Sequence, residues 1–214
     1  MNAVEVEDLR FAYGDELTVD VSKFALEPGQ SVAVIGPSGC GKTSFLHLLA
    51  GLLRPQSGSI RLLEQDLAEL QGASMDRFRG KNLGLVLQRF HLIKALTVRE
   101  NVLLADKLAR ANAGGDTVDT LLKRLNIDAV AQHKPSMLSQ GQAQRAAIAR
   151  ALVHKPRIVM ADEPTSALDD EHAAEAIGLL RDAVSEAGAT LIVVTHDQRV
   201  RGMLDRDFDF GVSA

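Results

Sequence analysis

Apolar and polar residues alternate along the first part of the chain, up to about residue 35. A period of two is typical of a β-strand that buries one face and exposes the other. Half-buried strands of this kind usually belong to an antiparallel sheet. The pattern therefore predicts an antiparallel sheet at the edge of the domain, with inward-facing positions at Val4, Val6, Leu9, Phe11, Leu17, Val19 and Val21.

Further along, short runs consist mainly of apolar residues. They cover residues 31–35, 84–87, 158–161 and 189–195. Such runs suit strands that are buried on both faces, as in a parallel sheet covered by helices. A Pro- and Gly-containing turn also precedes a predicted strand at 59–63.

Helical spacing separates these runs. Ile177, Leu180 and Val184 recur at intervals of three and four ahead of Gly188, which predicts a helix that ends at this glycine. Strands that alternate with helices are typical of an α/β fold. Other helices are predicted at 44–50, at 142–152 and within 97–136, which the stretch 113–116 divides.

The composition fits one globular domain, with or without an inserted lobe. Hydrophobic residues make up 46% of the 214 positions, an ordinary content for a chain that buries a core. The chain has 24 basic and 28 acidic side chains, which gives a net charge of −4. A broad nucleic-acid surface is therefore not expected, and no nucleic-acid partner is predicted.

Several features indicate a cytoplasmic location. No stretch approaches 18 uninterrupted apolar residues, so no membrane-spanning segment is expected. The first five residues lack the basic and apolar regions of a secretory signal. Cys40 is the only cysteine, which excludes an internal disulfide and fits a reducing compartment.

A phosphate-binding loop with the pattern G-x-x-x-x-G-K-[ST] follows the apolar run 31–35. Its glycines let phosphate oxygens approach the backbone, whose N–H groups bind them at the start of the next helix. Lys42 is expected to reach the β- and γ-phosphates of ATP, and the Thr43 hydroxyl is expected to bind Mg²⁺. The residues expected at the nucleotide are Gly36, Pro37, Ser38, Gly39, Cys40, Gly41, Lys42, Thr43 and Ser44.

Two carboxylates end the apolar run 158–161. Asp162 and Glu163 would lie at the carboxyl end of a buried strand, where open α/β sheets bind ligands. Asp162 suits a role on Mg²⁺, and Glu163 can polarise an attacking water. A solvated strand end would explain the pair equally well in isolation, but the upstream phosphate loop favours the functional interpretation.

The sequence LSQGQ at 138–142 adds a second anion site. Ser139 and Gly141 come just before the alanine-rich stretch 142–152, and a Ser–Gly helix N-terminus can bind an anion. With these motifs, nearly the whole chain resembles the ATP-binding cassette (ABC) family, whose signature is LSGGQ. The resemblance implies an α/β fold: a P-loop NTPase core with a mixed sheet, an antiparallel β subdomain and an inserted α-helical subdomain.

That resemblance also implies one domain over residues 1–214. The core and the antiparallel β subdomain would comprise 1–94 and 137–214, and the helical subdomain about 95–136. Gln140 departs from the commonest residue of the signature, which is glycine. If the backbone there had a positive φ, glutamine would cost on the order of 1 kcal/mol, whereas in a helix it would be harmless.

Further roles follow from the resemblance. It places Gln88 at Mg²⁺ and the attacking water, His196 at the γ-phosphate and that water, and Tyr13 on the adenine ring. Taken alone, these residues would be an ordinary surface amide, a loop histidine and a core aromatic. Residues of the signature and of the SALD segment are also implied at the nucleotide, namely Ser139, Gly141, Gln142 and Asp169.

Partners are implied in the same way. In the family, two subunits enclose two ATP molecules, so a homodimer with ATP at its interface is expected. Separate transmembrane permease subunits would hold it at the inner face of the cell membrane. The strings at 90–93 and 96–102 look most like the ATPases of lipoprotein release, macrolide export and cell division. Alternatives are a soluble ABC ATPase of DNA repair or translation, and an ATP-dependent switch in a cell-division complex.

Overall fold

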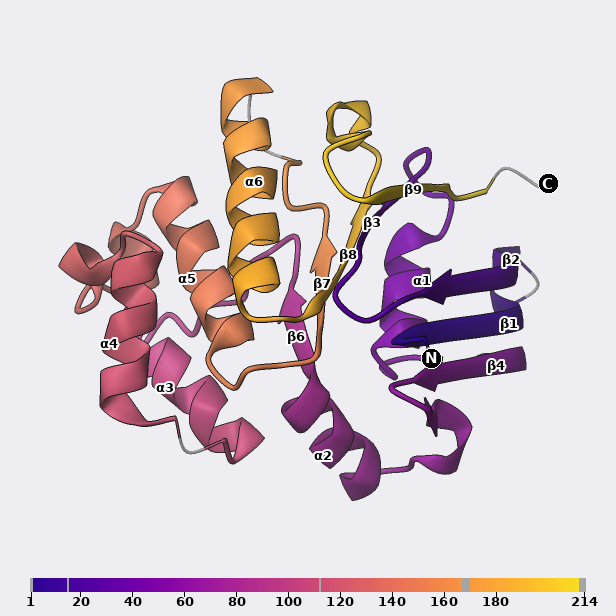
Figure 1. The fold of residues 1–214 in the computed structure, drawn as a ribbon, viewed down its shortest axis with the longest axis horizontal. Coiled ribbons are helices and arrows are strands. Elements are labelled where there is room, and N and C mark those ends of the chain that lie inside the picture. The colour runs from indigo at the N-terminus through magenta and orange to yellow at the C-terminus, as the bar shows by residue number, and fades with distance from the viewer. Residues whose placement is uncertain (1, 15, 112, 167–169, 212–214) are drawn as a thin grey trace.

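A parallel sheet of five strands forms the centre of the computed structural model (Figure 1). The strand order is β6-β7-β8-β3-β9, and every residue of β3, β7 and β8 is buried. This confirms the buried strands that the apolar runs predict. The strands span Ser31–Ile35 (β3), Leu83–Val86 (β6), Ile158–Asp162 (β7), Thr190–Thr195 (β8) and Arg206–Asp209 (β9).

A second sheet is antiparallel, with the order β2-β1-β4-β5. Its long hairpin pairs Val4 with Leu26 at one end and Tyr13 with Glu16 at the other. The alternating positions of β1 are buried, as their period of two predicts. Parallel and antiparallel strands therefore lie in two separate sheets. The strands span Val4–Tyr13 (β1), Glu16–Leu26 (β2), Ser57–Leu62 (β4) and Gln65–Asp66 (β5).

Helices cover both faces of the parallel sheet. Helix α1 lies between the two sheets, whereas α5 and α6 lie on the opposite face of the parallel sheet (Figure 1). Each face has its own cluster of buried apolar residues. The helices span Lys42–Leu49 (α1), Ala73–Asn82 (α2), Val98–Ala109 (α3), Gly114–Arg124 (α4), Gln140–Leu152 (α5) and Asp170–Glu186 (α6), with short 3₁₀ turns at Leu67–Glu69, Asp128–Val130, Pro135–Met137 and Gln198–Val200.

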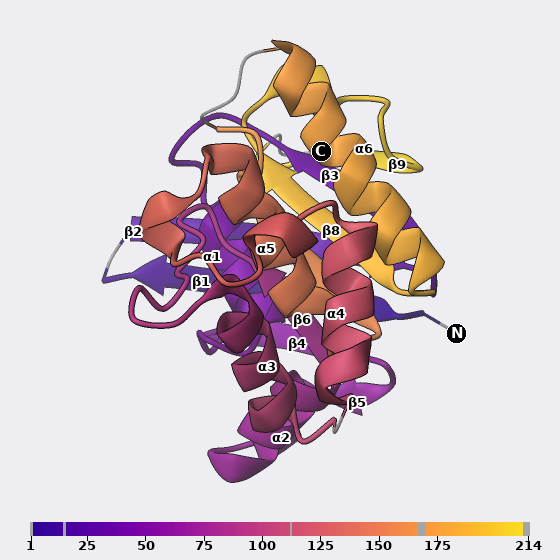
Figure 2. The ribbon, with the colours of Figure 1, turned by 90° about the vertical axis from the view of Figure 1, so that its left-hand side faces the viewer.

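Helices α3, α4 and α5 pack together beside the edge strand β6 (Figure 2). Helix α3 begins with a capping box, in which Thr97 and Glu100 bond to each other's backbone N–H. The boundary between α3 and α4 lies earlier than predicted, because Gly114 already belongs to α4. The reason is the buried Asp106, whose carboxylate accepts the N–H of Ala113 at 2.9 Å and so fixes the start of α4.

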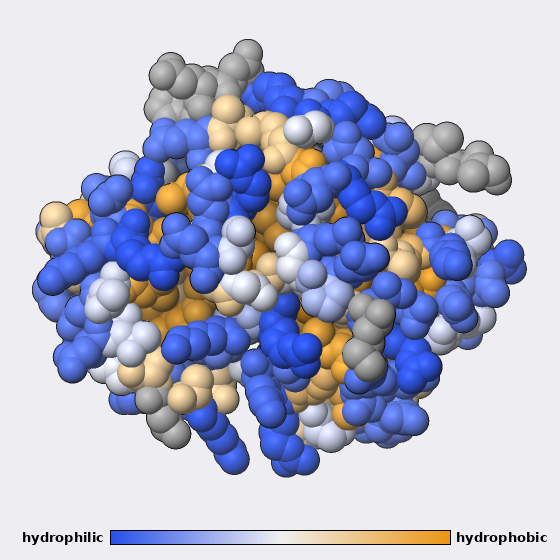
Figure 3. Space-filling model, viewed as in Figure 1, coloured by the Kyte–Doolittle hydropathy of each residue, from blue (hydrophilic) through white to orange (hydrophobic). Residues whose placement is uncertain are grey.

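The structure describes residues 2–14, 16–111, 113–166 and 170–211. Within these ranges no helix combines the length and the apolar character needed to cross a bilayer. Hydrophilic side chains dominate the face shown in Figure 3, with apolar residues in the hollows between them. This distribution is expected of a chain that buries its apolar residues in two clusters.

Phe45 offers a test of the packing around α1. Its side chain is fully buried, and its ring centroid lies 5.4 Å from that of Phe24 and 5.3 Å from that of Phe210. Phe45→Ala should lower the free energy of unfolding, measured in urea, by about 3–5 kcal/mol, because it leaves a cavity between the sheets. Leu108→Ala is the control, since Leu108 is 75% exposed and its loss should change stability by less than about 0.5 kcal/mol. Equal effects of the two variants would contradict this account.

Candidate functional site

The phosphate-binding loop packs closely against strand β2 and against the segment that follows β9. A Cβ atom on Gly41 would lie 2.0 Å from the carbonyl oxygen of Thr18 in β2. One on Gly36 would lie 2.5 Å from the carbonyl oxygen of Phe210, just after β9. Gly41 also has φ 98°, a conformation that favours glycine. Both glycines are therefore required by close backbone contacts, which the sequence pattern alone does not reveal.

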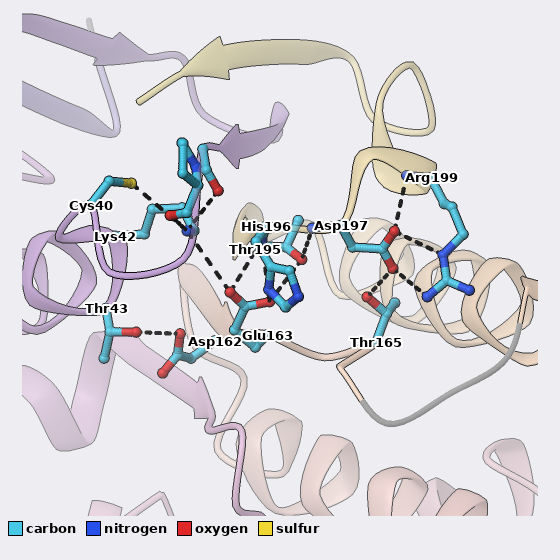
Figure 4. A network of polar contacts seen from close by, with 12 residues as sticks. Cys40, Lys42, Thr43, Asp162, Glu163, Thr165, Thr195, His196, Asp197 and Arg199 are labelled. Carbon is cyan, nitrogen blue, oxygen red and sulfur yellow. Dashed lines mark hydrogen bonds and ion pairs between the residues drawn. The ribbon is translucent and has the colours of Figure 1, made fainter. Parts of the chain in front are cut away.

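Lys42 is almost completely buried at the start of α1, with 5% of its surface exposed. Its Nζ donates hydrogen bonds to the carbonyl oxygens of Gly36 at 2.8 Å and Pro37 at 2.7 Å. The same atom lies 4.0 Å from Glu163 Oε1 (Figure 4). The ammonium group therefore sits between the loop and the end of β7, with its charge directed into the site.

Asp162 and Thr43 form the next part of the site. Asp162 ends β7 with 5% of its surface exposed, and its Oδ1 accepts the Thr43 hydroxyl at 3.0 Å (Figure 4). Burial raises the pKa of Asp162 and the neighbouring Glu163 adds to this, whereas the Thr43 hydroxyl and Lys42 oppose it. The direction of the shift shows that the cost of burying the charge exceeds the stabilisation by these groups. A buried carboxylate beside a hydroxyl is a donor set that suits Mg²⁺.

Glu163 follows β7 with φ 47°, a left-handed conformation that is uncommon for glutamate. Its N–H bonds to the carbonyl of Val194 at 2.8 Å, which joins it to the end of β8. Its carboxylate accepts the Thr195 hydroxyl at 2.9 Å and the His196 N–H at 3.1 Å. Two neighbouring strands therefore place this carboxylate at the mouth of the site.

His196 contacts the same carboxylate. Its Nδ1 lies 2.9 Å from Glu163 Oε2. An ionised carboxylate can only accept, so Nδ1 carries the proton in this arrangement and Nε2 is left for another partner. Helix α1 and the carboxyl ends of β7 and β8 thus bring together five of the residues that the sequence predicts at one site: Lys42, Thr43, Asp162, Glu163 and His196.

Four polar residues that no sequence motif indicates complete this cluster, namely Thr165, Thr195, Asp197 and Arg199. Asp197 accepts the hydroxyl of the fully buried Thr165 at 2.7 Å and two bonds from the Arg199 guanidinium at 2.8 Å (Figure 4). The Asp197 N–H in turn donates to Thr195 Oγ1 at 3.0 Å. The only signal in the sequence is that Thr195 and Asp197 flank His196, and Thr165 follows Glu163 by two positions.

The signature residues lie at the exposed start of α5. Ser139 is the N-cap and forms a capping box with Gln142, whose N–H donates to Ser139 Oγ at 3.3 Å. Gln140 is the first helical residue and does not have a positive φ, so glutamine there carries no backbone strain. A Cβ on Gly141 would meet no atom of the described residues within 4 Å, and therefore nothing in this part of the chain requires a glycine at that position.

Among the described residues, Gln88 and Tyr13 are not joined to this cluster. Gln88 is exposed in the loop after β6, and its side chain forms no hydrogen bond with the residues that the structure describes. Tyr13 is 56% exposed at the end of β1, where its ring meets Phe11 edge-to-face at 4.8 Å. Asp169 lies outside the described residues. Their predicted roles at the nucleotide stay predictions.

Arg150, which the sequence did not single out either, holds the loop that contains Gln88. Its guanidinium donates to the carbonyl oxygens of Phe90 and His91, each at 2.7 Å. Burial lowers the pKa of Arg150. Since Arg150 belongs to α5, the loop after β6 and the helix that begins at the signature are directly linked.

Known proteins share this combination of fold and motifs. The family model described as ABC transporter matches residues 19–166. The chain belongs to the ABC transporter family. The cassette is 43% identical over 183 residues to the lipoprotein-releasing system ATP-binding protein LolD of Syntrophotalea carbinolica, an alignment that covers 85% of this cassette and 81% of LolD.

The cassette is also similar to a longer curated relative and to a solved dimeric structure. The cassette is 39% identical over 194 residues to the uncharacterized ABC transporter ATP-binding protein Rv2564 of Mycobacterium tuberculosis, covering 90% of this chain but 57% of that protein. The cassette thus spans little more than half of that relative's length. A dimeric, post-hydrolysis structure of the ATP-binding cassette MJ0796 bound to ADP and Pi has a TM-score of 0.84 at 31% identity, covering 97% of this chain and 95% of MJ0796. This confirms the predicted ABC ATPase fold class.

Asp197 gives the site a pH-dependent contribution to stability. The hydrogen bond from Arg199 is the main cause that lowers the pKa of Asp197 to about 2, with Thr165 adding to it. A depressed carboxyl pKa stabilises the folded cassette above the unfolded pKa, and this stabilisation disappears as the pH falls from about 4 to about 2. Asp197→Asn should therefore lower the free energy of unfolding at pH 7 by about 2 kcal/mol, and the difference from the wild type should shrink below pH 4.

Urea unfolding of the nucleotide-free cassette at pH 7, 4 and 3 measures this difference. Asp182→Asn is the control, because Asp182 is largely exposed and its ion pair with Arg181 should contribute little. A loss for Asp197→Asn that is equally large at pH 7 and pH 3 would contradict the titration of Asp197 as the cause.

Proposed function

We propose that this cassette binds ATP with Mg²⁺ and hydrolyses it to ADP and phosphate. The observation that carries the proposal is the position of Glu163. Its carboxylate lies at the carboxyl end of β7, 4.0 Å from the buried Nζ of Lys42 and one residue from Asp162. A phosphate-binding cation and a base at the same edge of a parallel sheet are the two groups that phosphoryl transfer to water requires.

The loop 36–43 supplies the phosphate site. The close contacts of Gly36 and Gly41 fix its backbone, so its N–H groups can bind phosphate oxygens at the start of α1. Lys42 supplies a positive charge that pairs with the phosphates. Asp162 and the Thr43 hydroxyl would hold Mg²⁺, since the buried Asp162 has a raised pKa and needs a positive partner. When bound, Mg²⁺ would neutralise charge on the phosphate oxygens.

Glu163 and His196 would carry out the proton chemistry. The Glu163 carboxylate would accept a proton from the water that attacks the γ-phosphate. The proton on His196 Nδ1 is directed to Glu163, and this bond fixes the imidazole ring. His196 Nε2 would then face the γ-phosphate and the attacking water, as the family resemblance implies.

A complete site would need two copies of the cassette. Helices α1 and α5 start on opposite faces of the parallel sheet (Figure 1). Among the described residues, no hydrogen bond joins the loop 36–43 to the signature 138–142. Gly141 lies in the first turn of α5, where glycine is a poorer helix former than alanine, and no described residue needs the space that it leaves. These observations support a head-to-tail homodimer in which the signature of one copy faces the nucleotide of the other. The dimeric form of MJ0796 is further support.

Hydrolysis in this dimer would drive separate transmembrane permease subunits, with the cassette bound at the inner face of the cell membrane. Support comes from the family and from relatives such as LolD, which is named for a lipoprotein-releasing system. The domain division into residues 1–94 with 137–214, and about 95–136, belongs to the same proposal. The helical part would transmit motion between the signature and the membrane partner, and the Arg150 link to the loop after β6 supports this.

Glu163→Gln tests the role of the proposed base. Turnover should fall by roughly 10²–10⁴-fold, because the amide cannot accept the proton, whereas ATP affinity should persist. Steady-state ATPase assays and equilibrium nucleotide binding measure the two quantities. Glu7→Gln is the control, since Glu7 is an exposed glutamate in β1. Wild-type turnover in Glu163→Gln would remove Glu163 from the mechanism.

Mixed dimers test the shared site. Lys42→Ala in one subunit and Ser139→Ala in the other leave one intact composite site, so mixing two inactive homodimers should restore up to one site's turnover. The matched comparison pairs a wild-type subunit with one that carries both substitutions. There each composite site has one damaged part, and turnover should stay low.

If each site were built within one chain, the dimer of Lys42→Ala with Ser139→Ala would be inactive, and the dimer of wild type with the double variant would keep one active site. That result would refute the head-to-tail dimer. Loss of an N-cap itself costs about 1 kcal/mol of stability. Thr97→Ala therefore serves as the control for Ser139→Ala, because it removes the same kind of capping box from α3. It should leave turnover close to that of the wild type.

A further inference from the structure

Thr195, the last residue of β8, is completely buried beside the proposed base. Its hydroxyl lies 2.9 Å from Glu163 Oε2 and 3.0 Å from the N–H of Asp197. A hydroxyl has one proton to donate. Since the amide of Asp197 is a donor and uses the oxygen as an acceptor, the proton of Thr195 is directed to the Glu163 carboxylate.

Asp197, whose N–H donates to the Thr195 hydroxyl, is itself held in place. The Asp197 carboxylate is held by the Thr165 hydroxyl at 2.7 Å and by the Arg199 guanidinium. Asp197 therefore keeps its N–H aimed at Thr195. The β-branched side chain of threonine also has few χ1 rotamers, so its hydroxyl cannot easily turn away. Rotation would remove this partner from the Asp197 amide and from Glu163 Oε2.

Glu163 needs such a partner, because the last torsion of a glutamate side chain is broad and does not fix the carboxylate by itself. Lys42 Nζ approaches the other oxygen, Oε1, at 4.0 Å. His196 bonds to both oxygens, through its N–H to Oε1 at 3.1 Å and its Nδ1 to Oε2 at 2.9 Å. The Thr195 hydroxyl adds a second bond to Oε2 from a side chain that is completely buried, and so it helps to set the rotation of the carboxylate plane. The direction in which Glu163 can accept a proton depends on this rotation.

We propose that Thr195 is a positioning residue for ATP hydrolysis, and that it acts by fixing the carboxylate of Glu163. This inference rests on the proposed function of Glu163 as the base. Thr195 contacts the loop 36–43 through its backbone, because its carbonyl oxygen accepts the Gly36 N–H at 3.3 Å. Its hydroxyl bonds only to Glu163 and the Asp197 N–H among the described residues, so a change of the side chain keeps the bond to the loop and is expected to affect turnover and not nucleotide affinity.

Thr195→Val and Thr195→Ser provide the test in the full-length cassette. The valine variant should lose about 10- to 100-fold in kcat, the size expected for a hydrogen bond to a charged group. KM for ATP and the equilibrium affinity for ATP should change less than about twofold, since uniform binding is not altered. The serine variant keeps the hydroxyl and should retain turnover within about threefold of the wild type.

Thr190→Val is the matched control. Thr190 begins the same strand, is 1% exposed, and also uses its hydroxyl in one backbone contact, as the acceptor of the Gly29 N–H at 2.9 Å. The same substitution there removes a buried hydroxyl from β8 without changing Glu163. Its kcat should remain near that of the wild type. An equal loss of kcat in Thr190→Val, or no rescue by Thr195→Ser, would assign the effect to the strand and overturn the proposal.

A double-mutant cycle separates this inference from the proposed function. In the Glu163→Gln background, Thr195→Val should have almost no further effect on the residual turnover, because the group through which it acts is absent. The same fold-loss in both backgrounds would overturn the positioning role. If Glu163→Gln lost turnover while Thr195→Val kept it, only the assignment of Thr195 would fail. Wild-type turnover in Glu163→Gln would overturn both.

Discussion

Complete burial of the central strands is the constraint on which the rest of the structure depends. Helices cover both faces of the parallel sheet, so no residue of β3, β7 or β8 is exposed along its length. Polar side chains can gather only where these strands end. Because the strands are parallel, their carboxyl ends lie along one edge. There Glu163, which follows β7, contacts Thr195 and His196 at the end of β8.

Electrostatics then organises this edge. Lys42 is nearly buried and carries two carbonyl contacts, but the carboxylate nearest to its ammonium group remains 4.0 Å away. Burial raises the pKa of Asp162, which shows that its charge is costly to bury. The two adjacent carboxylates, Asp162 and Glu163, share the site with the single ammonium group of Lys42. The carboxylates can therefore pair with a metal cation, and the ammonium group can pair with phosphate. A complex of a metal ion with a phosphate supplies both partners.

Much of this architecture could be predicted from the sequence. Apolar runs located β3, β7 and β8, and the glycine and lysine pattern located the loop before α1. Helix α2 and strand β9 were not predicted, because α2 has only one buried residue and β9 is mostly exposed, so neither carries a periodic apolar pattern. Thr195, which bonds to Glu163, and Asp197, which bonds to Thr195, also escaped prediction. Both are common polar residues, and only the pairing of β7 with β8 brings Thr195 to Glu163.

The two crowded glycines of the phosphate loop also differ in how freely they can change over evolutionary time. Gly41 faces two independent obstacles, a left-handed backbone and a carbonyl of β2 only 2.0 Å from where a side chain would begin. A substitution elsewhere that moved the β2 carbonyl would still leave the left-handed backbone of Gly41. We therefore expect glycine to be the residue that this position retains. Gly36 has no positive φ, and the atoms nearest to a Cβ there belong to Phe210 and Cys40. A shift of the segment after β9 would therefore relieve the closest contact and allow another residue at this position.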